Sequence, residues 1–458
     1  MNIIKSTYII LVSFLIMNMF VSCEKMLEVD VPTHELPSDI IFEDVQTANS
    51  ALAGLYAKMR DNAPLAANGS GALLGIYTDD LDYYANPVSN ATFDLFNNTQ
   101  IDTNTTVSSF WSESYEVIYI ANSIISGCDS SLALPTSEKN RIKGEALLAR
   151  SLILLYLQQI FGDIPYPIST DYTINQVLGK TASDQVLIQL ANDVNLSISL
   201  LPNEYRSAER IFLNKKAGEL ILAKIYMIQQ RYTEAEILLK GIVSDPRYVF
   251  EQDLTKVFTK TGKHIIWQLK PQNGAATKES TLYYFGNVAP SLYALSGALA
   301  QSFVASDLRK TNWTASSTFN GNTWLRSSKY KNRLPGNDTE YSIVFRLEEA
   351  YLLLSECYLQ QNRLNEALPY VNATRQRASL VPLGQPISKE NLLNEIILEN
   401  RHEFFAEMGH RFLDLKRINR LNSLIPIKPN WKSYHLLWPI PQKEVLMNAN
   451  LKPQNSGY

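Results

Sequence analysis

Apolar side chains recur at helical spacing in several segments of this chain, which predicts a mainly α-helical fold. Residues 183–201 form one such segment, and Ser183 or Asp184 is placed as its N-cap. Its apolar positions on one helical face are Val186, Leu187, Leu190, Val194 and Ile198. The same spacing predicts further helices over residues 47–59, 110–125, 139–161 and 389–405.

Two segments of the chain share one pattern of small, aromatic and charged positions at a constant offset of 132 residues, as from 226 to 358. Leu222, Ala223, Tyr226 and Ala235 in the first segment become Leu354, Ser355, Tyr358 and Ala367 in the second. In tetratricopeptide units, such a small residue lets two antiparallel helices approach closely, and the tyrosine fills the seam between them. We therefore expect helix pairs near residues 214–243 and 347–376.

Two long stretches, residues 62–109 and 270–340, have no helical period. Both are rich in Gly, Asn, Ser and Thr, with aromatic residues scattered among them. Loops of this length inside a compact protein are more often functional than filler. The fold expected for residues 38–458 is a single domain: a tetratricopeptide-like helical-repeat scaffold with these two irregular insertions and a few short strands. One strand is expected over His264–Leu269.

The first 37 residues predict an export signal and a tether. Lys5 precedes an uncharged apolar run from Tyr8 to Phe20, which is too short for a membrane-spanning helix. The run ends at Ser22-Cys23, and this junction resembles a bacterial lipobox, in which the cysteine is lipidated. We expect a lipoprotein signal peptide over 1–22 and a lipidated tether over 23–37. The alternative is an ordinary signal peptide with a cysteine nearby.

Composition narrows the choice of ligand and excludes nucleic acid. A net charge of −3 leaves no basic surplus for binding nucleic acid. Charged residues make up only 19% of the chain, so amides and hydroxyls supply much of its polar surface, which suits a neutral, hydroxyl-rich ligand. Beyond Cys23, Cys128 and Cys357 are too few for a disulfide framework, and their pairing stays open.

Three blocks of residues stand out along the chain: FGDIP at 161–165, the charged block from Glu399 to Arg417, and WPIP at 438–441 with the closing QNSGY at 454–458. In this order and spacing, they resemble the SusD/RagB family of outer-membrane lipoproteins, which bind nutrients, usually glycans. Asn400 and Met408-Gly409 depart from the commoner residues of the charged block. The family's ligand contacts lie in variable loops, so no binding residue carries over.

The resemblance implies a role and a location. The chain would be anchored in the outer membrane through lipid on Cys23, facing the cell exterior. It would capture an oligosaccharide and deliver it to a SusC-like TonB-dependent transporter, without a metal or organic cofactor. A peptide-binding member of the family, or a helical-repeat adaptor with no small ligand, remains the alternative. The glycan and the face that meets the transporter stay open.

Catalysis has little basis in the sequence. His402-Glu403 is not followed by a histidine at 406, which a zinc protease helix requires, and the acidic and basic residues around it are expected to form an ion-pair cluster instead. Asp79, Asp80 and Asp82 could pair as glycosidase carboxyls, but loop acids more often bond sugar hydroxyls or cap helices. We expect no enzyme activity.

Aromatic residues in the polar insertions are the candidate ligand contacts. Tyr and Trp rings can cover the flat C–H face of a pyranose, while amides and carboxylates bond its rim of hydroxyls. Trp111 and Trp267 are expected in the core instead. The residues expected to bind the ligand are Asp82, Tyr83, Tyr84, Asn86, Asn312, Trp313, Trp324, Tyr283 and Tyr284.

Overall fold

The structure is a computed structural model that describes residues 38–86 and 90–458, so Cys23 and its leader lie outside the described residues. It confirms the mainly helical fold class. The scaffold helices are α2 (Ser38–Ile41), α3 (Val45–Asp61), α6 (Thr105–Ser130), α7 (Thr136–Phe161), α9 (Ser183–Leu200), α10 (Lys215–Ile228), α11 (Tyr232–Val243), α15 (Leu347–Gln360), α16 (Leu364–Arg377) and α17 (Lys389–Phe404).

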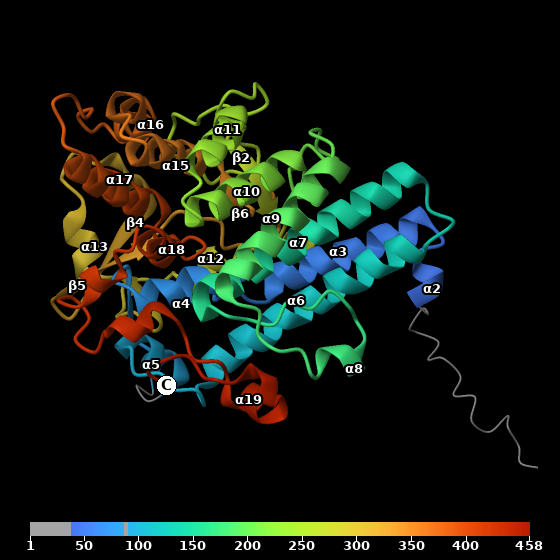
Figure 1. Ribbon diagram of the computed structural model, residues 1–458. Coiled ribbons are helices and arrows are strands. Elements are labelled where there is room, and N and C mark those ends of the chain that lie inside the picture. Colours follow the sequence, from blue (N-terminus) through green and yellow to red (C-terminus); the bar gives the residue numbers. More distant parts are fainter. Residues whose placement is uncertain (1–37, 87–89) are drawn as a thin grey trace, which may run out of the picture.

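The scaffold helices pack one on the next. Figure 1 shows α3, α6 and α7 running side by side, and α7, α9, α10 and α11 continue the stack. Helix α11 then packs directly against α15, although the whole second insertion separates them in the chain. At this seam the Cys357 Sγ lies 3.0 Å from the Met227 Sδ, and Arg363 pairs with Glu236 at 2.7 Å. The two helix pairs therefore form one continuous stack.

The shared pattern of the two helix pairs has a physical basis in the structure. Ser355 is fully buried, and its hydroxyl donates to the Ala367 carbonyl at 2.9 Å, which holds α15 close to α16. The arginine five residues after each tyrosine stacks on that ring: Arg231 lies 4.1 Å from the Tyr226 centroid, and Arg363 lies 4.4 Å from the Tyr358 centroid.

The first insertion is less irregular than we expected. It contains α4 (Ser70–Tyr77), β1 (Leu81–Tyr83) and α5 (Ala91–Asn97), and α6 already begins at Thr105. Every residue of α4 is buried. A helix buried on all sides has no polar face, so its sequence shows no helical period and does not predict the helix.

The second insertion also contains more regular structure than its sequence suggested. Strands β4 (Thr314–Phe319) and β5 (Asn322–Ser327) form an antiparallel hairpin. Its turn is Asn320-Gly321, and both residues have positive φ (49° and 77°), as a tight hairpin turn requires. The other elements between residues 265 and 346 are β2 (Ile265–Leu269), η3 (Gln272–Gly274), α12 (Lys278–Leu282), β3 (Tyr293–Leu295), α13 (Gly297–Ser302), α14 (Leu308–Trp313) and β6 (Ser342–Arg346).

The short helix α8 (Tyr172–Asn175) lies in the segment between α7 and α9. The C-terminal segment closes the fold with short helices around the first insertion. They are α18 (His410–Arg417), η4 (Leu421–Leu424), η5 (Ser433–Leu436), α19 (Gln442–Met447) and η6 (Ala449–Leu451). Trp438 from this segment is buried against Phe110 and Phe161, with ring centroids 5.4 and 6.0 Å away.

Both cysteines of the described chain, Cys128 and Cys357, are buried free thiols. The pairing that the sequence left open is therefore absent from the structure. Among the described residues, no helix has the length and apolar character needed to cross a bilayer.

Candidate functional site

The two insertions meet through a short antiparallel sheet. Strand β1 of the first insertion pairs with β3 of the second, and Tyr83 lies opposite Tyr293. The pairing continues past the strand, because the Tyr84 amide donates to the Leu292 carbonyl at 2.8 Å. Strand β5 packs beside β3 and brings the β4–β5 hairpin to the same place. Segments more than 200 residues apart in sequence thus build one surface.

One face of the β4–β5 hairpin turns toward this junction. Trp324 and Arg326 project from the same side of β5, because side chains two residues apart on a strand share a face. Trp324 pairs with Ser317 across the hairpin, and the Ser317 hydroxyl donates to the carbonyls of Gly286 and Val288. The hairpin is therefore fixed against the segment that follows Tyr284.

Tyr84, Trp324 and Tyr284 form a partly open aromatic surface at this junction. Tyr84 is 37% exposed and Tyr284 is 40% exposed, while Trp324 is half-buried. Burial and the charge of Asp82 raise the pKa of the Tyr84 hydroxyl, and the side chain of Trp324, which lies against this hydroxyl, acts in the opposite direction. Tyr84 and Trp324, one from each insertion, are thus neighbours.

A hollow of about 350 Å³ opens beside this aromatic surface, and both insertions line it. Asp82 reaches it from β1, Gly297 from the start of α13, and Lys428 from the C-terminal segment. Burial raises the pKa of Asp82, and the positive charge of Lys428 opposes that rise. Asp82, the neighbour of Tyr84 on this surface, lines the hollow, whereas the Lys428 ammonium at its wall already donates to the carbonyls of Ile76 and Phe96.

Burial removes two of the expected contacts from this surface. Trp313 is only 1% exposed, and its indole N–H donates to the Leu254 carbonyl at 2.9 Å. Tyr283 is 3% exposed, and its ring packs against Tyr293. Neither ring can lie against a sugar, so Trp313 and Tyr283 are corrected from ligand contacts to core residues.

The remaining expected contacts divide between the surface and the scaffold. Tyr83 is half-buried and packs on Tyr293 at 5.4 Å, so it supports the surface from below. Asn86 is exposed two residues beyond Tyr84. Asn312 lies on α14, where its amide already donates to the Leu308 carbonyl.

Sequence analysis did not single out Arg326 or Arg333, although both lie against this surface. The guanidinium of Arg333 lies 3.3 Å from the Tyr284 ring centroid, and that of Arg326 lies 4.5 Å from it. Burial and the neighbouring Arg333 charge lower the pKa of Arg326. The sequence does contain a signal for Arg326. Asn320-Gly321 is a typical hairpin turn, and Trp324 and Arg326 lie two residues apart on the strand that follows it, so they share one face.

The acidic pair at Asp79 and Asp80 holds the scaffold together. Arg401 of α17 donates to the Asp80 carboxylate at 2.8 Å, and Arg411 of α18 donates to the Asp79 carboxylate at the same distance. Both aspartates are buried, and each pairs with an arginine. They therefore do not form a pair of opposed acids across an open cleft, as a glycosidase needs.

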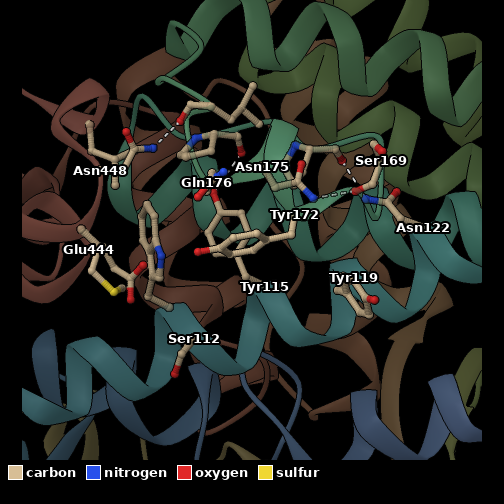
Figure 2. A pocket seen from close by; sticks show the side chains of 16 residues that line it. Ser112, Tyr115, Tyr119, Asn122, Ser169, Tyr172, Asn175, Gln176, Glu444 and Asn448 are labelled. Carbon is tan, nitrogen blue, oxygen red and sulfur yellow. Dashed lines mark hydrogen bonds between the residues drawn. The ribbon is translucent and has the colours of Figure 1, made fainter. Parts of the chain in front are cut away.

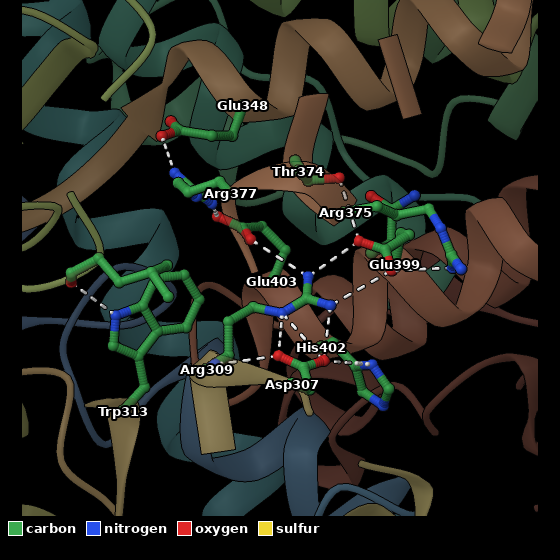
Figure 3. A network of polar contacts seen from close by, with 12 residues as sticks. Asp307, Arg309, Trp313, Glu348, Thr374, Arg375, Arg377, Glu399, His402 and Glu403 are labelled. Atoms are coloured by element: carbon green, nitrogen blue, oxygen red, sulfur yellow. Dashed lines mark hydrogen bonds and ion pairs between the residues drawn. The ribbon is translucent and has the colours of Figure 1, made fainter. Parts of the chain in front are cut away.

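A buried ion-pair network surrounds Glu399 and Glu403 of α17, as expected for the charged block, although its partners come from other elements (Figure 3). Arg309 pairs with Glu399 at 2.9 Å and with Asp307 at 2.8 Å. Glu403 pairs with Arg346 and Arg377, and these cations hold its pKa below the usual range although burial acts to raise it. The network fixes α17 to the second insertion.

His402 belongs to the same network and has a structural role. Its Nε2 lies 2.8 Å from the Ser302 hydroxyl, and its ring stacks on Phe303 at 4.1 Å. Burial and the nearby arginines lower the pKa of His402 to about 2, so the ring is neutral at physiological pH. Within residues 38–86 and 90–458, no cluster of three His, Cys, Asp or Glu side chains is arranged to hold a metal ion.

A second cavity, of about 460 Å³, lies between α6, the segment around α8 and the C-terminal α19 (Figure 2). Several of its polar groups already bond the protein backbone. Tyr115 donates to Pro165, Asn122 to Pro167, and Asn175 to Ser169, all to carbonyls at 2.8–3.0 Å. These bonds hold residues 165–175 over α6.

Two family models match the chain in sequence order. A model described as starch-binding and associating with the outer membrane matches residues 27–227, and the SusD family model matches residues 300–458. Among curated proteins, SusD-like protein P25 of Formosa agariphila is 24% identical, covering 99% of this chain and 100% of the relative. SusD-like protein P2 of the same organism is 23% identical over 99% of both chains.

Solved structures share the fold over nearly the whole chain. A SusD superfamily protein from Bacteroides vulgatus superposes with a TM-score of 0.81 at 20% identity, covering 91% of this chain and 100% of its own. Surface glycan-binding protein A from Bacteroides thetaiotaomicron, solved with laminarihexaose, superposes with a TM-score of 0.77 at 19% identity. The match covers 90% of this chain and 99% of that protein's chain.

Proposed function

We propose that this chain, which belongs to the SusD/RagB family, captures oligosaccharides at the cell surface and delivers them to a partner TonB-dependent transporter. The observation that carries the proposal is the meeting of the two insertions, which sets Tyr84 beside Trp324 on an open surface. Aromatic rings at such a surface can cover the C–H face of a sugar, and Asp82 and Asn86 lie within the same segment to bond its hydroxyls.

The relatives support a glycan as the ligand class. One solved structure with this fold holds laminarihexaose, and another is described as a laminarin-binding SusD-like protein. A shallow surface buries little area per sugar, so we expect a Kd on the order of micromolar to millimolar. Weak binding suits capture, because the transporter must be able to take the ligand away.

The proposal includes no catalysis. The acids that could have acted as a glycosidase pair, Asp79 and Asp80, are committed to Arg401 and Arg411. His402 and Glu403 are buried in the α17 network. A protein of this kind would release its ligand unchanged and would need no cofactor.

The proposed location is the outer membrane, with lipid on Cys23, residues 24–37 as the tether and the body facing the cell exterior. The first family match is described as associating with the outer membrane, which agrees with this location. The outer face of the stacked helix pairs is the proposed docking face for the transporter.

Two experiments test these proposals separately. Binding of the full-length protein in detergent to a broad panel of oligosaccharides and peptides tests capture. A glycan hit supports it; a peptide hit alone would assign the chain to peptide capture; a flat response to both contradicts capture. Affinity purification from native membranes tests docking: recovery of a large TonB-dependent β-barrel supports it, and recovery of the chain alone counts against it.

A further inference from the structure

Arg326 and Arg333 stand apart from the other arginines of the protein. All arginines of the chain lie within the described residues, and the side chain of every one except these two makes an ion pair or a hydrogen bond there. The Nε of Arg326 is buried with no hydrogen-bond acceptor in the described part of the chain. Two guanidinium groups without anionic partners thus occur at one place.

That place is the aromatic surface of the proposed ligand site. Both guanidiniums lie on the Tyr284 ring, at 3.3 Å for Arg333 and 4.5 Å for Arg326. Arg326 also shares a face of β5 with Trp324, which lies against Tyr84. A planar ring under each guanidinium limits its rotation, so its donors are already oriented before a ligand arrives.

Neither guanidinium is paired with an acid in the described part of the chain, although Asp338, five residues beyond Arg333, is exposed. Glu340 is the nearest buried acid in sequence, and its carboxylate accepts from the backbone amides of Lys331 and Asn332. Asp82, across the surface, faces the hollow that Lys428 lines. Nothing in the described residues neutralises the two guanidiniums.

We propose that the ligand of this surface is an acidic oligosaccharide, whose carboxylate or sulfate groups bind Arg326 and Arg333 while its sugar rings lie on Tyr84 and Trp324. This inference rests on the proposed glycan-capture function and adds its substrate class. A guanidinium group can donate two parallel N–H bonds to two oxygens of a carboxylate or of a sulfate. A neutral glycan would leave both cations unpaired at the site.

One oligosaccharide backbone in three forms provides the test: neutral, sulfated, and with its primary alcohols oxidised to carboxylates. Calorimetry with the full-length protein in detergent measures the Kd for each form. We expect at least one acidic form to bind about tenfold or more tightly than the neutral form, and to weaken at 0.5 M salt. The acidic form with the lower Kd shows whether the site prefers sulfate or carboxylate groups.

The variant R326Q/R333Q should lose the preference for the acidic form, because glutamine cannot form the charged pair with a carboxylate or sulfate. A matched control is R231Q/R363Q, which removes two arginines that also stack on tyrosines but lie on the helix pairs, with glutamate partners. The control should keep the preference. Melting curves confirm folding, and R326Q/R333Q should melt only slightly below the wild type, because it breaks no ion pair and removes only two surface cation–π contacts.

The inference is contradicted if the neutral form binds at least as tightly as both acidic forms, or if R326Q/R333Q keeps the preference. Either result is compatible with glycan capture, provided that the neutral form binds. If none of the three forms binds and the broad panel also gives no glycan hit, glycan capture and its acidic specificity fail together.

Discussion

Arg401 and Asp80 lie 321 residues apart in sequence, and the Arg401 Nε donates to the Asp80 carboxylate at 2.8 Å. The bond joins α17 of the scaffold to the segment just before β1, which leads to Tyr84. Arg411 makes the equivalent bond to Asp79 from α18. The late charged block of the sequence thus anchors the first insertion, and the position of the proposed ligand surface depends on it.

Arg401→Met should destabilise the protein strongly. It leaves the buried carboxylate of Asp80 without its cation, and removing one partner of a buried pair costs about 3–5 kcal/mol. Urea denaturation measures the change in the free energy of unfolding. Arg420→Met is the matched control, because its pair with Glu390 is exposed and contributes about 1 kcal/mol or less. Equal losses in the two variants would contradict the anchoring role.

Replacement by alanine should cost much more stability at Trp313 than at Trp324. Trp313 is buried and hydrogen-bonded, so Trp313→Ala should cost about 3–5 kcal/mol of stability. Trp324→Ala should cost about 1 kcal/mol or less, because the ring is partly exposed. Thermal or urea melting of the two variants checks this order, and a larger loss for Trp324→Ala would contradict the assignment of Trp313 to the core.

Acid should weaken the fold partly through His402. In the unfolded chain this histidine binds a proton near its ordinary pKa of 6.5, whereas in the folded protein its pKa is about 2. Below pH 6.5 the unfolded state therefore binds more protons, and stability falls by up to about 1.4 kcal/mol per pH unit from this group. Above pH 6.5 both states are neutral there and the effect is absent.

His402→Gln should reduce the slope of the unfolding free energy against pH between pH 6 and pH 4. The reduction should correspond to about one proton, because glutamine can still bond Ser302 but does not titrate. Urea melts at several pH values give the slope for both proteins. An unchanged slope in the variant would show that His402 is protonated in the folded state.

Cys128 and Cys357 should resist alkylation in the native protein. Burial raises the pKa of the Cys128 thiol to about 11 and also raises that of Cys357, so neither forms the reactive thiolate at neutral pH. Iodoacetamide treatment followed by peptide mass spectrometry should find both unmodified until urea is added. Rapid labelling of either thiol in native buffer would contradict its burial.

The sequence predicted the scaffold well because its signals are periodic. The Tyr226 and Tyr358 pattern located both helix pairs, and helix spacing located α9 and α17 within a residue or two. It failed for α4, where full burial leaves no polar face to create a period. Local pattern therefore predicts amphipathic helices, and elements buried on all sides need the tertiary structure.

The candidate site was predictable by region and not by residue. Tyr84, Trp324 and Tyr284 do lie at the junction of the insertions, yet Trp313 and Tyr283, in equally polar surroundings, are buried. Sequence neighbours cannot show which ring turns inward, because that depends on partners such as Leu254 and Tyr293 from distant segments. For the same reason Arg326 and Arg333 were overlooked: a missing partner is visible only in three dimensions.

The central claim is that both insertions bind one ligand together, and a double-mutant cycle on Tyr84 and Trp324 tests it most directly. Calorimetry with any glycan that the full-length protein binds would compare Y84A, W324A and Y84A/W324A with the wild type. We predict that each single change weakens binding by about tenfold and that the double change costs measurably less than the sum, because neighbouring rings share one ligand. Wild-type affinity in either single variant, with unchanged melting, would contradict the account.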